Sequence, residues 1–195
     1  MKVKTLFLIC FLSITCLLNA ADKPVIQIHT DNSSLIFRVA DNGRLYQSYL
    51  GKKLNHETDI SHLPQGTEAY ITHGMEDYFE PAIHILHNDG NPSLLLKYVS
   101  HETKVVSQGV NETIITLGDD KYPVTVKLHY VTYPAEDIIK TYTEISHKEK
   151  KPVVLHQYAS SMLHLNRAKY YLTEFSGDWA HEANISDQPL EFGKK

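Results

Sequence analysis

Apolar and polar residues alternate along much of the chain, and short turn motifs separate the alternating stretches. Residues 124–130 show this pattern most clearly, because their apolar positions are Val124, Val126, Leu128 and Tyr130. A period of two is typical of a β-strand with one buried face and one exposed face. We therefore expect a strand at residues 124–130, joined to a strand at 113–117 by a turn at 118–120.

The same signals recur through the rest of the chain. Residues 35–39 and 45–50 alternate on either side of Asp41, Asn42 and Gly43, which predicts a β-hairpin. Residues 82–86 are apolar and precede turn-forming residues at 88–92, so a second hairpin is expected there. The remaining strand candidates are residues 94–99, residues 137–146 and the long apolar stretch 153–165.

The pattern leaves little room for helices. Residues 51–68 are polar and irregular, which predicts a surface excursion. No stretch combines a helical apolar stripe with capping residues, so any helix should be short. Many strands separated by turns about ten residues apart predict an all-β fold of the β-sandwich class.

The first 21 residues have the features of a signal peptide. Lys2 and Lys4 precede an apolar run at residues 6–18, and the small residue Ala20 precedes a cut after position 20 or 21. We expect residues 22–195 to form the mature domain, secreted or periplasmic. An alternative is a loose lipoprotein box that would anchor the chain through Cys16. Both cysteines of the chain lie in this segment, so the mature protein would hold no disulfide.

Composition excludes several classes of protein. The 195 residues are 42% hydrophobic and 22% charged, with a formal net charge of −4. This is enough apolar material for one sizeable core, and it excludes general disorder. The chain lacks the basic footprint of a nucleic-acid-binding protein, so no nucleic-acid partner is expected. Its 12 tyrosines favour β structure.

The strongest candidate for chemistry is an acidic loop between Gly74 and Pro81, both of which disfavour helix. It holds three carboxylates and two aromatic rings in five residues: Glu76, Asp77, Tyr78, Phe79 and Glu80. Such a loop can bind a neutral sugar, because carboxylates accept hydrogen bonds from hydroxyl groups while rings cover the C–H face. The alternative is a solvated loop in which the two rings are packing anchors.

The residues alone give no catalytic constellation. The sequence has no Gly-rich phosphate loop, Walker box or Gly-x-Ser-x-Gly motif. Glu76, Asp77 and Glu80 offer carboxylates, but neighbours on one loop seldom flank a sugar ring from both sides. His84 and His87 are three positions apart and would point to opposite faces of a strand. We therefore predict no catalytic residue, no metal and no cofactor for this chain.

A family resemblance becomes specific at the acidic loop. Residues 74–82, GMEDYFEPA, resemble the Gly-x-Gly-Asp-[Phe/Tyr]-Arg-Glu-Pro-Ala motif in the N-terminal domain of glycoside hydrolase family 36, the melibiase-type α-galactosidases. Four further stretches fall in the order expected of that domain, at residues 39–45, 98–102, 122–130 and 171–182. The last of these is similar to the family's Gly-x-Trp-Ala-[Arg/Lys]-Glu signature.

The resemblance implies a β-supersandwich related to galactose-mutarotase-like folds, which in full-length members precedes a (β/α)₈ barrel. In the family, that barrel carries two catalytic aspartates and hydrolyses terminal α-galactosides with retention. This chain ends at Lys195, before any barrel strand, so the resemblance implies a domain that is inactive alone. The implied partners are the barrel, other copies in a homo-oligomer, and the galactose moiety of an α-galactoside.

The resemblance also assigns roles to individual residues. By motif position, Asp77 and Tyr78 would contact galactose in the active site of a neighbouring subunit. The sequence departs from the motif at Glu76, which replaces a glycine, and at Phe79, which replaces an arginine. Trp179, the only tryptophan, is expected to be an interdomain packing anchor, or else a ring that stacks on sugar. A free-standing carbohydrate-binding module and an inert truncated gene product stay open as alternative functions.

Overall fold

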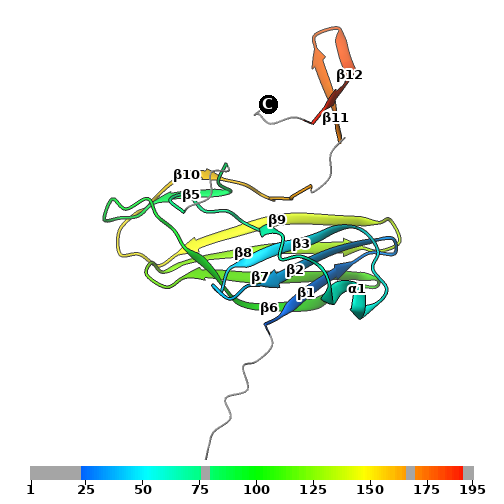
Figure 1. Cartoon of the computed structure of the whole chain (residues 1–195). Helices are drawn as coiled ribbons and strands as arrows, with labels where there is room; N and C mark the ends of the chain where they lie inside the picture. Colours follow the sequence, from blue (N-terminus) through cyan, green and yellow to red (C-terminus); the bar gives the residue numbers. More distant parts are fainter. Residues whose placement is uncertain (1–22, 76–79, 166–169, 191–195) are drawn as a thin grey trace, which may run out of the picture.

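The computed structural model describes residues 23–75, 80–165 and 170–190. The predicted signal peptide and Cys16 lie outside the described residues, as do residues 76–79, 166–169 and 191–195. Two four-stranded antiparallel sheets form the body of the described chain, and two smaller strand pairs accompany them (Figure 1).

The first sheet has the strand order β1-β2-β3-β4. Its strands are β1 (Val25–His29), β2 (Ser33–Val39), β3 (Leu45–Lys52) and β4 (Thr67–Glu68). The predicted hairpin is confirmed, because β2 pairs with β3 and the chain reverses between them at Gly43. Gly43 has a φ of 79°, a conformation that glycine adopts without strain.

The second sheet has the order β6-β7-β8-β9. Its strands are β6 (Leu96–Ser107), β7 (Val110–Asp119), β8 (Val124–Tyr133) and β9 (Ile138–His147). The strands predicted around residues 113–117, 124–130 and 137–146 are confirmed. Val126 lies opposite Leu117 on one side and Ile145 on the other, so one face of the sheet is apolar across three strands.

The core lies between these two sheets, as the alternating pattern predicts. Phe37 from the first sheet and Tyr130 from the second approach each other with ring centroids 5.1 Å apart. One buried cluster joins the facing side chains, among them Ile26, Ile28, Leu35, Phe37, Ile115, Leu117, Val126, Leu128 and Tyr130. The all-β class and the sandwich architecture are therefore confirmed.

A short helix covers the outer face of the first sheet. Ile36 points away from the core cluster and is nevertheless fully buried. Arg38, two positions on and on the same face, donates a hydrogen bond to the carbonyl of Ile60 in α1 (Glu57–Ser61). The expected surface excursion at residues 51–68 thus contains the one short helix of the described chain. No helix in the described part of the chain is long and apolar enough to cross a membrane.

Two sequence predictions are wrong, and both concern the small pair formed by β5 and β10. β5 (Ile83–Leu86) pairs with β10 (Val154–Tyr158), so the turn at residues 88–92 does not close a hairpin but leads to β6. The strand expected at residues 153–165 ends at Tyr158. Beyond it the chain bonds to the first sheet instead, because the Gln47 amide donates to the carbonyl of His164 and accepts from its N–H.

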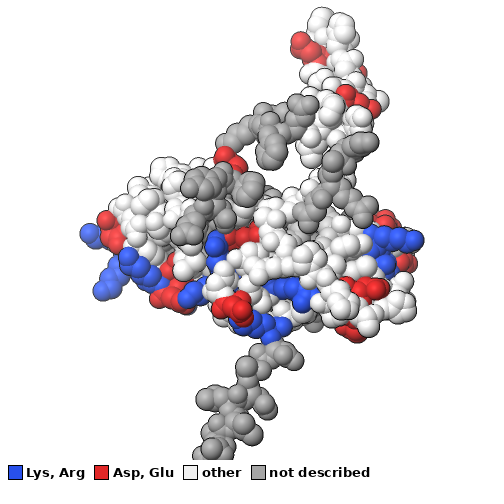
Figure 2. All heavy atoms as spheres, in the orientation of Figure 1, with Lys and Arg blue, Asp and Glu red and all other residues white. Residues whose placement is uncertain are grey.

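The last two strands form a hairpin that stands away from the sandwich (Figure 1). β11 (Tyr171–Asp178) pairs with β12 (His181–Pro189), and the register places Tyr171, Phe175 and Ile185 on one face. Residues 170–190 include four acidic side chains and no Lys or Arg, and only acidic residues are coloured on the hairpin in Figure 2. A lone two-stranded hairpin is marginal in water, so contact with another domain or chain would stabilise this one.

Gly66 directly precedes β4 and lies against the backbone of β3, so a substitution at Gly66 tests the packing of these two strands. It has a φ of 82°, and a Cβ there would lie 1.9 Å from the carbonyl oxygen of Gln47. Gly66→Ala should lower the free energy of unfolding by about 3 kcal/mol or more, measured by urea denaturation. Gly109→Ala is the matched control, since Gly109 has a φ of 74° and nothing within 4 Å of the added carbon. It should cost only about 1 kcal/mol; equal losses would show that the clash with β3 is unimportant.

Candidate functional site

The tip of the acidic loop lies outside the described residues, but the structure describes both of its ends. The predicted substrate-binding residues Asp77 and Tyr78 belong to that tip, together with Glu76 and Phe79. The loop is entered at residues 72–75 and left at residues 80–82. The geometry of these ends shows how firmly they themselves are held.

At the entry, the chain is bound to β5 and packed against a neighbouring turn. Thr72 forms a parallel bridge with Ile83, and the His73 N–H donates to the Ile83 carbonyl at 3.0 Å. Gly74 follows with a φ of 84°, and a Cβ on it would lie 2.9 Å from the Cα of Ser93. Glycine is therefore required here both by the backbone conformation and by the close approach to Ser93.

At the exit, β10 holds the loop. The side-chain amide of Gln157 donates to the Glu80 carboxylate at 2.9 Å and to the Pro81 carbonyl at 2.8 Å. The Ala82 N–H donates to the Ile71 carbonyl at 2.8 Å, which ties the exit to the entry. Both ends of the loop are thus fixed to the β5–β10 pair.

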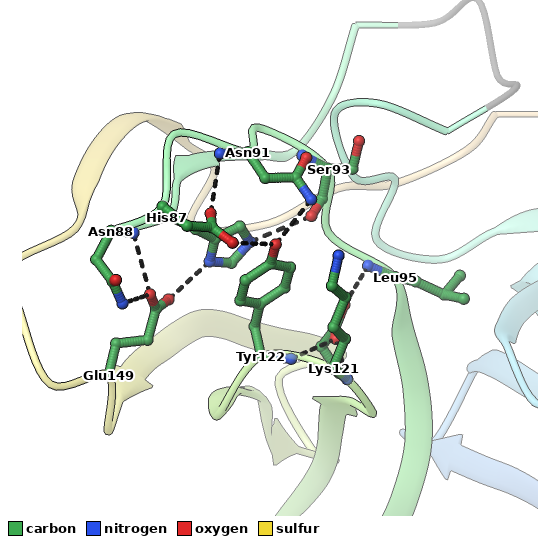
Figure 3. Close-up of polar contacts among 10 residues, drawn as sticks. His87, Asn88, Asn91, Ser93, Leu95, Lys121, Tyr122 and Glu149 are labelled. Atoms are coloured by element: carbon green, nitrogen blue, oxygen red, sulfur yellow. Dashed lines mark hydrogen bonds and ion pairs between the residues drawn. The ribbon is translucent and has the colours of Figure 1, made fainter.

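The turn at residues 87–93, on which Gly74 rests, is held by its own polar side chains (Figure 3). The Tyr122 hydroxyl donates to the Asp89 carboxylate at 2.9 Å and accepts from the Asn91 amide at 2.8 Å. The side-chain oxygen Oδ1 of Asn91 accepts a hydrogen bond from the Ser93 N–H at 3.0 Å. Asp and Asn side chains that bond to nearby backbone groups favour tight turns, and so does the glycine at position 90 with its positive φ. The turn is therefore locked to the β7–β8 connection that carries Tyr122.

A buried ion pair joins the same turn to the connection between β9 and β10 (Figure 3). His87 Nδ1 lies 2.7 Å from one oxygen of Glu149, and the Asn88 N–H and side-chain amide both donate to the other oxygen. His87 Nε2 lies 3.2 Å from the Ser93 carbonyl. Both ring nitrogens face acceptors, so the ring donates to both only when it carries two protons. The His87 ring also stacks on Tyr122 at a centroid distance of 3.6 Å.

The environment of Glu149 favours its charged form. Burial raises the pKa of Glu149, but hydrogen bonds from His87 and Asn88 outweigh burial, and the net shift is downward from the ordinary 4.5. Its side chain is only 2% exposed. The carboxylate is thus an inner clamp of the loop base, and it is too enclosed to meet a sugar.

Beside the loop entry, an open hollow of about 230 Å³ lies between the 87–93 turn and the β7–β8 connection. Met75, Leu94 and Leu95 contribute apolar lining, and Asp119 contributes a carboxylate. Asp119 is already engaged, because it accepts hydrogen bonds from the N–H groups of Leu95, Lys121 and Tyr122. Asp120, the second carboxylate of the lining, forms an ion pair with Lys97. Both carboxylates that the described residues contribute to the hollow therefore already have partners.

Three histidine rings lie close together near the loop base, where His73 stacks on His84 and His156 is tilted against His84. The His84 ring centroid lies 3.7 Å from that of His73 and 4.8 Å from that of His156. Burial lowers the pKa of His84, and the neighbouring His73 and His156 lower it further. Among the residues that the structure describes, no group of three His, Cys, Asp or Glu side chains is arranged to hold a metal ion.

Comparison with known proteins identifies the domain to which this loop belongs. The sequence model of the Glycosyl hydrolase family 36 N-terminal domain matches residues 40–195. The chain belongs to this family. The resemblance inferred from five motifs is therefore confirmed, and the chain can be described as a family 36 N-terminal domain.

Two curated relatives of this family 36 domain are fungal enzymes. Probable alpha-galactosidase G of Aspergillus terreus is 25% identical over 133 residues, which are 62% of this chain and 18% of that protein. Alpha-galactosidase C of Emericella nidulans is 27% identical over the same shares. The chain thus spans less than a fifth of the length of these relatives.

Solved structures share the fold. The family 36 α-galactosidase AgaA of Geobacillus stearothermophilus, in complex with raffinose, matches 87% of this chain and 28% of its own, with a TM-score of 0.78 at 19% identity. The α-galactosidase of Lactobacillus brevis covers the same shares with a TM-score of 0.74 at 20% identity. Likeness at this level of identity shows the architecture of the domain and leaves residue roles to be argued from the chain itself.

Trp179, the predicted packing anchor, lies at the tip of the β11–β12 hairpin of the family 36 domain. Its side chain is 92% exposed, and Phe175 on the same hairpin is 71% exposed. The Trp179 N–H donates to the Asp178 carboxylate at 2.7 Å, which supports the tight turn. The ring is therefore presented outward, away from the core of its own domain.

Sequence reasoning missed the residues that hold the loop base. Glu149 lies in a charged segment that resembles any solvated turn, and nothing near it in the sequence points to His87. Tyr122 is the first residue of the family motif at residues 122–130, and this was the only feature of the sequence that drew attention to it. The contact between these residues depends on the pairing of β5 with β10, which no local pattern specifies.

Removing the Glu149 carboxylate should loosen the loop base. Glu149→Ala leaves the buried His87 ring without its carboxylate partner and also removes the acceptor of the exposed Asn88, so the free energy of unfolding at pH 7 should fall by about 3–5 kcal/mol. Because folding lowers the pKa of Glu149, its contribution is complete above pH 4.5 and declines as the pH falls below that value. The difference between wild type and variant should therefore shrink in acid.

Amide hydrogen exchange provides the local readout for this prediction. The Gly90 and Asn91 N–H groups should lose protection in Glu149→Ala. Glu136→Ala is the matched control, because Glu136 is exposed in the turn between β8 and β9 and its loss should cost below about 1 kcal/mol. If both variants had the same stability and exchange, the clamp described above would be wrong.

Proposed function

We propose that the chain is the non-catalytic N-terminal domain of a secreted α-galactosidase that hydrolyses terminal α-D-galactosides with retention of configuration. In this proposal the domain supports a (β/α)₈ barrel elsewhere in the enzyme. Asp77 and Tyr78 reach a galactose subsite in a neighbouring subunit. The observation that carries the proposal is the family motif at residues 74–82, set on a base that fixes both of its ends.

The fixed base supports a binding role for the loop. Only residues 76–79 separate Met75, next to the glycine packed on Ser93, from Glu80, which is bonded to Gln157. A short loop between fixed ends loses little conformational entropy when it binds a ligand, which favours affinity. Asp77 accepts hydrogen bonds from sugar hydroxyls and the Tyr78 ring covers a C–H face. Glu76 and Phe79 alter the family motif, and Phe79 replaces a cationic contact with an apolar one.

The substrate class rests on the relatives. The solved α-galactosidase AgaA is described in complexes with raffinose and with stachyose, both of which are galactosides. The curated relatives are likewise named as α-galactosidases. For this chain the proposed ligand is therefore the terminal galactose of an α-galactoside oligosaccharide.

The exposed apolar side chains support a partner domain. Of the sixteen large hydrophobic residues exposed in the described chain, eleven follow residue 153: Val154, Leu155, Tyr158, Leu163, Leu165, Tyr170, Tyr171, Phe175, Trp179, Ile185 and Leu190. Apolar exposure on this scale in one part of a chain marks an interaction surface. The hairpin among them is acidic, so the matching surface on the catalytic barrel would be apolar with basic residues at its rim. Trp179 would be the central anchor of this contact.

The loop role can be tested in a full-length family 36 enzyme that carries this domain. Asp77→Ala should lower kcat/KM for raffinose by about 5- to 150-fold, equivalent to about 1–3 kcal/mol of lost hydrogen bonding in an enclosed subsite. Glu136→Ala, at an exposed turn, is the control and should leave kcat/KM unchanged. Unchanged kinetics in Asp77→Ala would remove the loop from the substrate site.

A carbohydrate-binding module is the second candidate, favoured by the exposed aromatic rings of Trp179, Phe175 and Tyr171. Titration calorimetry of the purified chain with melibiose and raffinose separates the two functions. A domain that supplies half of a subsite should give no measurable heat of binding. Saturable binding that is lost in Trp179→Ala would instead favour the module.

A further inference from the structure

The edge strand β6 has no partner on its outer side. β6 is the longest strand of the described chain, and it hydrogen-bonds along one edge to β7. Its other edge is met only at the start, where the Tyr98 N–H donates to the Gly43 carbonyl at 2.8 Å. From residue 99 to residue 107, no described residue other than those of β7 pairs with its backbone, and all nine side chains are exposed. Such an edge is a template for another strand.

Two irregularities in the β6–β7 hydrogen-bond pairing mark where the regular part of the free β6 edge begins and ends. The β6–β7 register shifts between Tyr98 and Ser100 and again between Val105 and Ser107. β-Bulges of this kind bend a strand and end its ability to pair further. The segment open to a partner strand is therefore residues 100–105, and its centre lies close to Thr103.

The charges on this segment are self-complementary. Glu102 and Lys104 lie on the same face of the sheet, because they stand opposite Ile114 and Glu112 of β7. If two copies of the strand pair antiparallel about Thr103, Glu102 of each copy faces Lys104 of the other. In any other antiparallel register that leaves the same face of both copies on the same side of the joined sheet, Glu102 or Lys104 lies opposite an uncharged residue. Opposite charges across a strand pair stabilise it, and like charges destabilise it.

The surroundings of Lys104 favour the same arrangement. Its ammonium group lies 3.0 Å from the second oxygen of Glu112. Hydrogen bonds from Tyr142 at 2.6 Å and His129 at 2.9 Å lower the pKa of Glu112 to about 2, so this carboxylate stays charged and holds Lys104 in place. Lys104 is thus preorganised beside the free edge, with donors left for a second carboxylate.

We propose that β6 is a dimer interface at which a second copy of this chain adds its own β6 in antiparallel register about Thr103. The β6–β9 sheet of one copy and the β6–β9 sheet of the other then form one eight-stranded sheet across a two-fold axis. Val105, which is 75% exposed, comes to lie opposite His101 of the second copy and is partly covered. The interface lies on the opposite side of the body from the β11–β12 hairpin in Figure 1, so it does not depend on the proposed galactosidase function.

Sedimentation of the purified chain tests this interface. Wild type should pass from monomer to dimer between about 5 and about 500 µM, a range suited to a small interface. Glu102→Lys places lysines opposite each other and should raise the dimer Kd at least tenfold, about 1.4 kcal/mol. Lys104→Glu should do the same. An equimolar mixture of the two variants should form a heterodimer, because every facing pair is then opposite in charge.

Controls keep each outcome decisive. Lys140→Glu reverses a charge on β9 at the other edge of the same sheet and should leave the dimer Kd unchanged. Circular dichroism checks that Lys104→Glu folds without its bond to Glu112. Independently of any variant, amide exchange at residues 100–105 of wild type should slow as protein concentration rises. A chain that stays monomeric would overturn the proposal, as would association that survives Glu102→Lys but is lost in Phe175→Ser on the hairpin.

Discussion

The bond between Glu149 and His87 is the contact on which the loop base depends. It connects the end of β5 to the segment between β9 and β10, and Tyr122 extends the connection to the β7–β8 turn. Further hydrogen bonds support the same junction, since the Asn88 N–H donates to Glu149 and the Lys148 N–H donates to the Pro123 carbonyl at 2.8 Å. A buried charge is costly when it loses its partner, so this junction is stable only while the His87 ring and the Glu149 carboxylate stay together. The described ends of the acidic loop, at residues 72–75 and 80–82, lie against this arrangement.

Local patterns predicted the sandwich well because its strands pair with their neighbours in sequence. The hairpin at Gly43 and the ladder from β7 to β9 follow directly from alternation and turn residues. β5 fails this reasoning, since its partner β10 lies far along the chain and the turn at residues 88–92 gives the signal of a hairpin. Glu149 fails for the same reason. The loop motif was visible from the sequence, but the clamp that holds it depends on non-local pairing.

The domain has two exposed surfaces of different character. The apolar residues beyond position 153, with the acidic hairpin among them, suit a partner with an apolar and basic surface. The β6 edge carries both signs of charge at adjacent positions on one face and suits a copy of itself. In the enzyme proposed above, separating the two kinds of surface would let domain docking and subunit assembly use contacts that do not compete.

The projecting hairpin has a consequence for how the domain behaves alone. β11 and β12 bury few side chains, and the Asp178 to His181 turn is open to solvent. Local opening there costs little free energy, so proteases would cut the free domain at this point first. If a partner covers the hairpin, the rate of proteolysis at this turn should fall, and that rate would show whether the domain is bound or free.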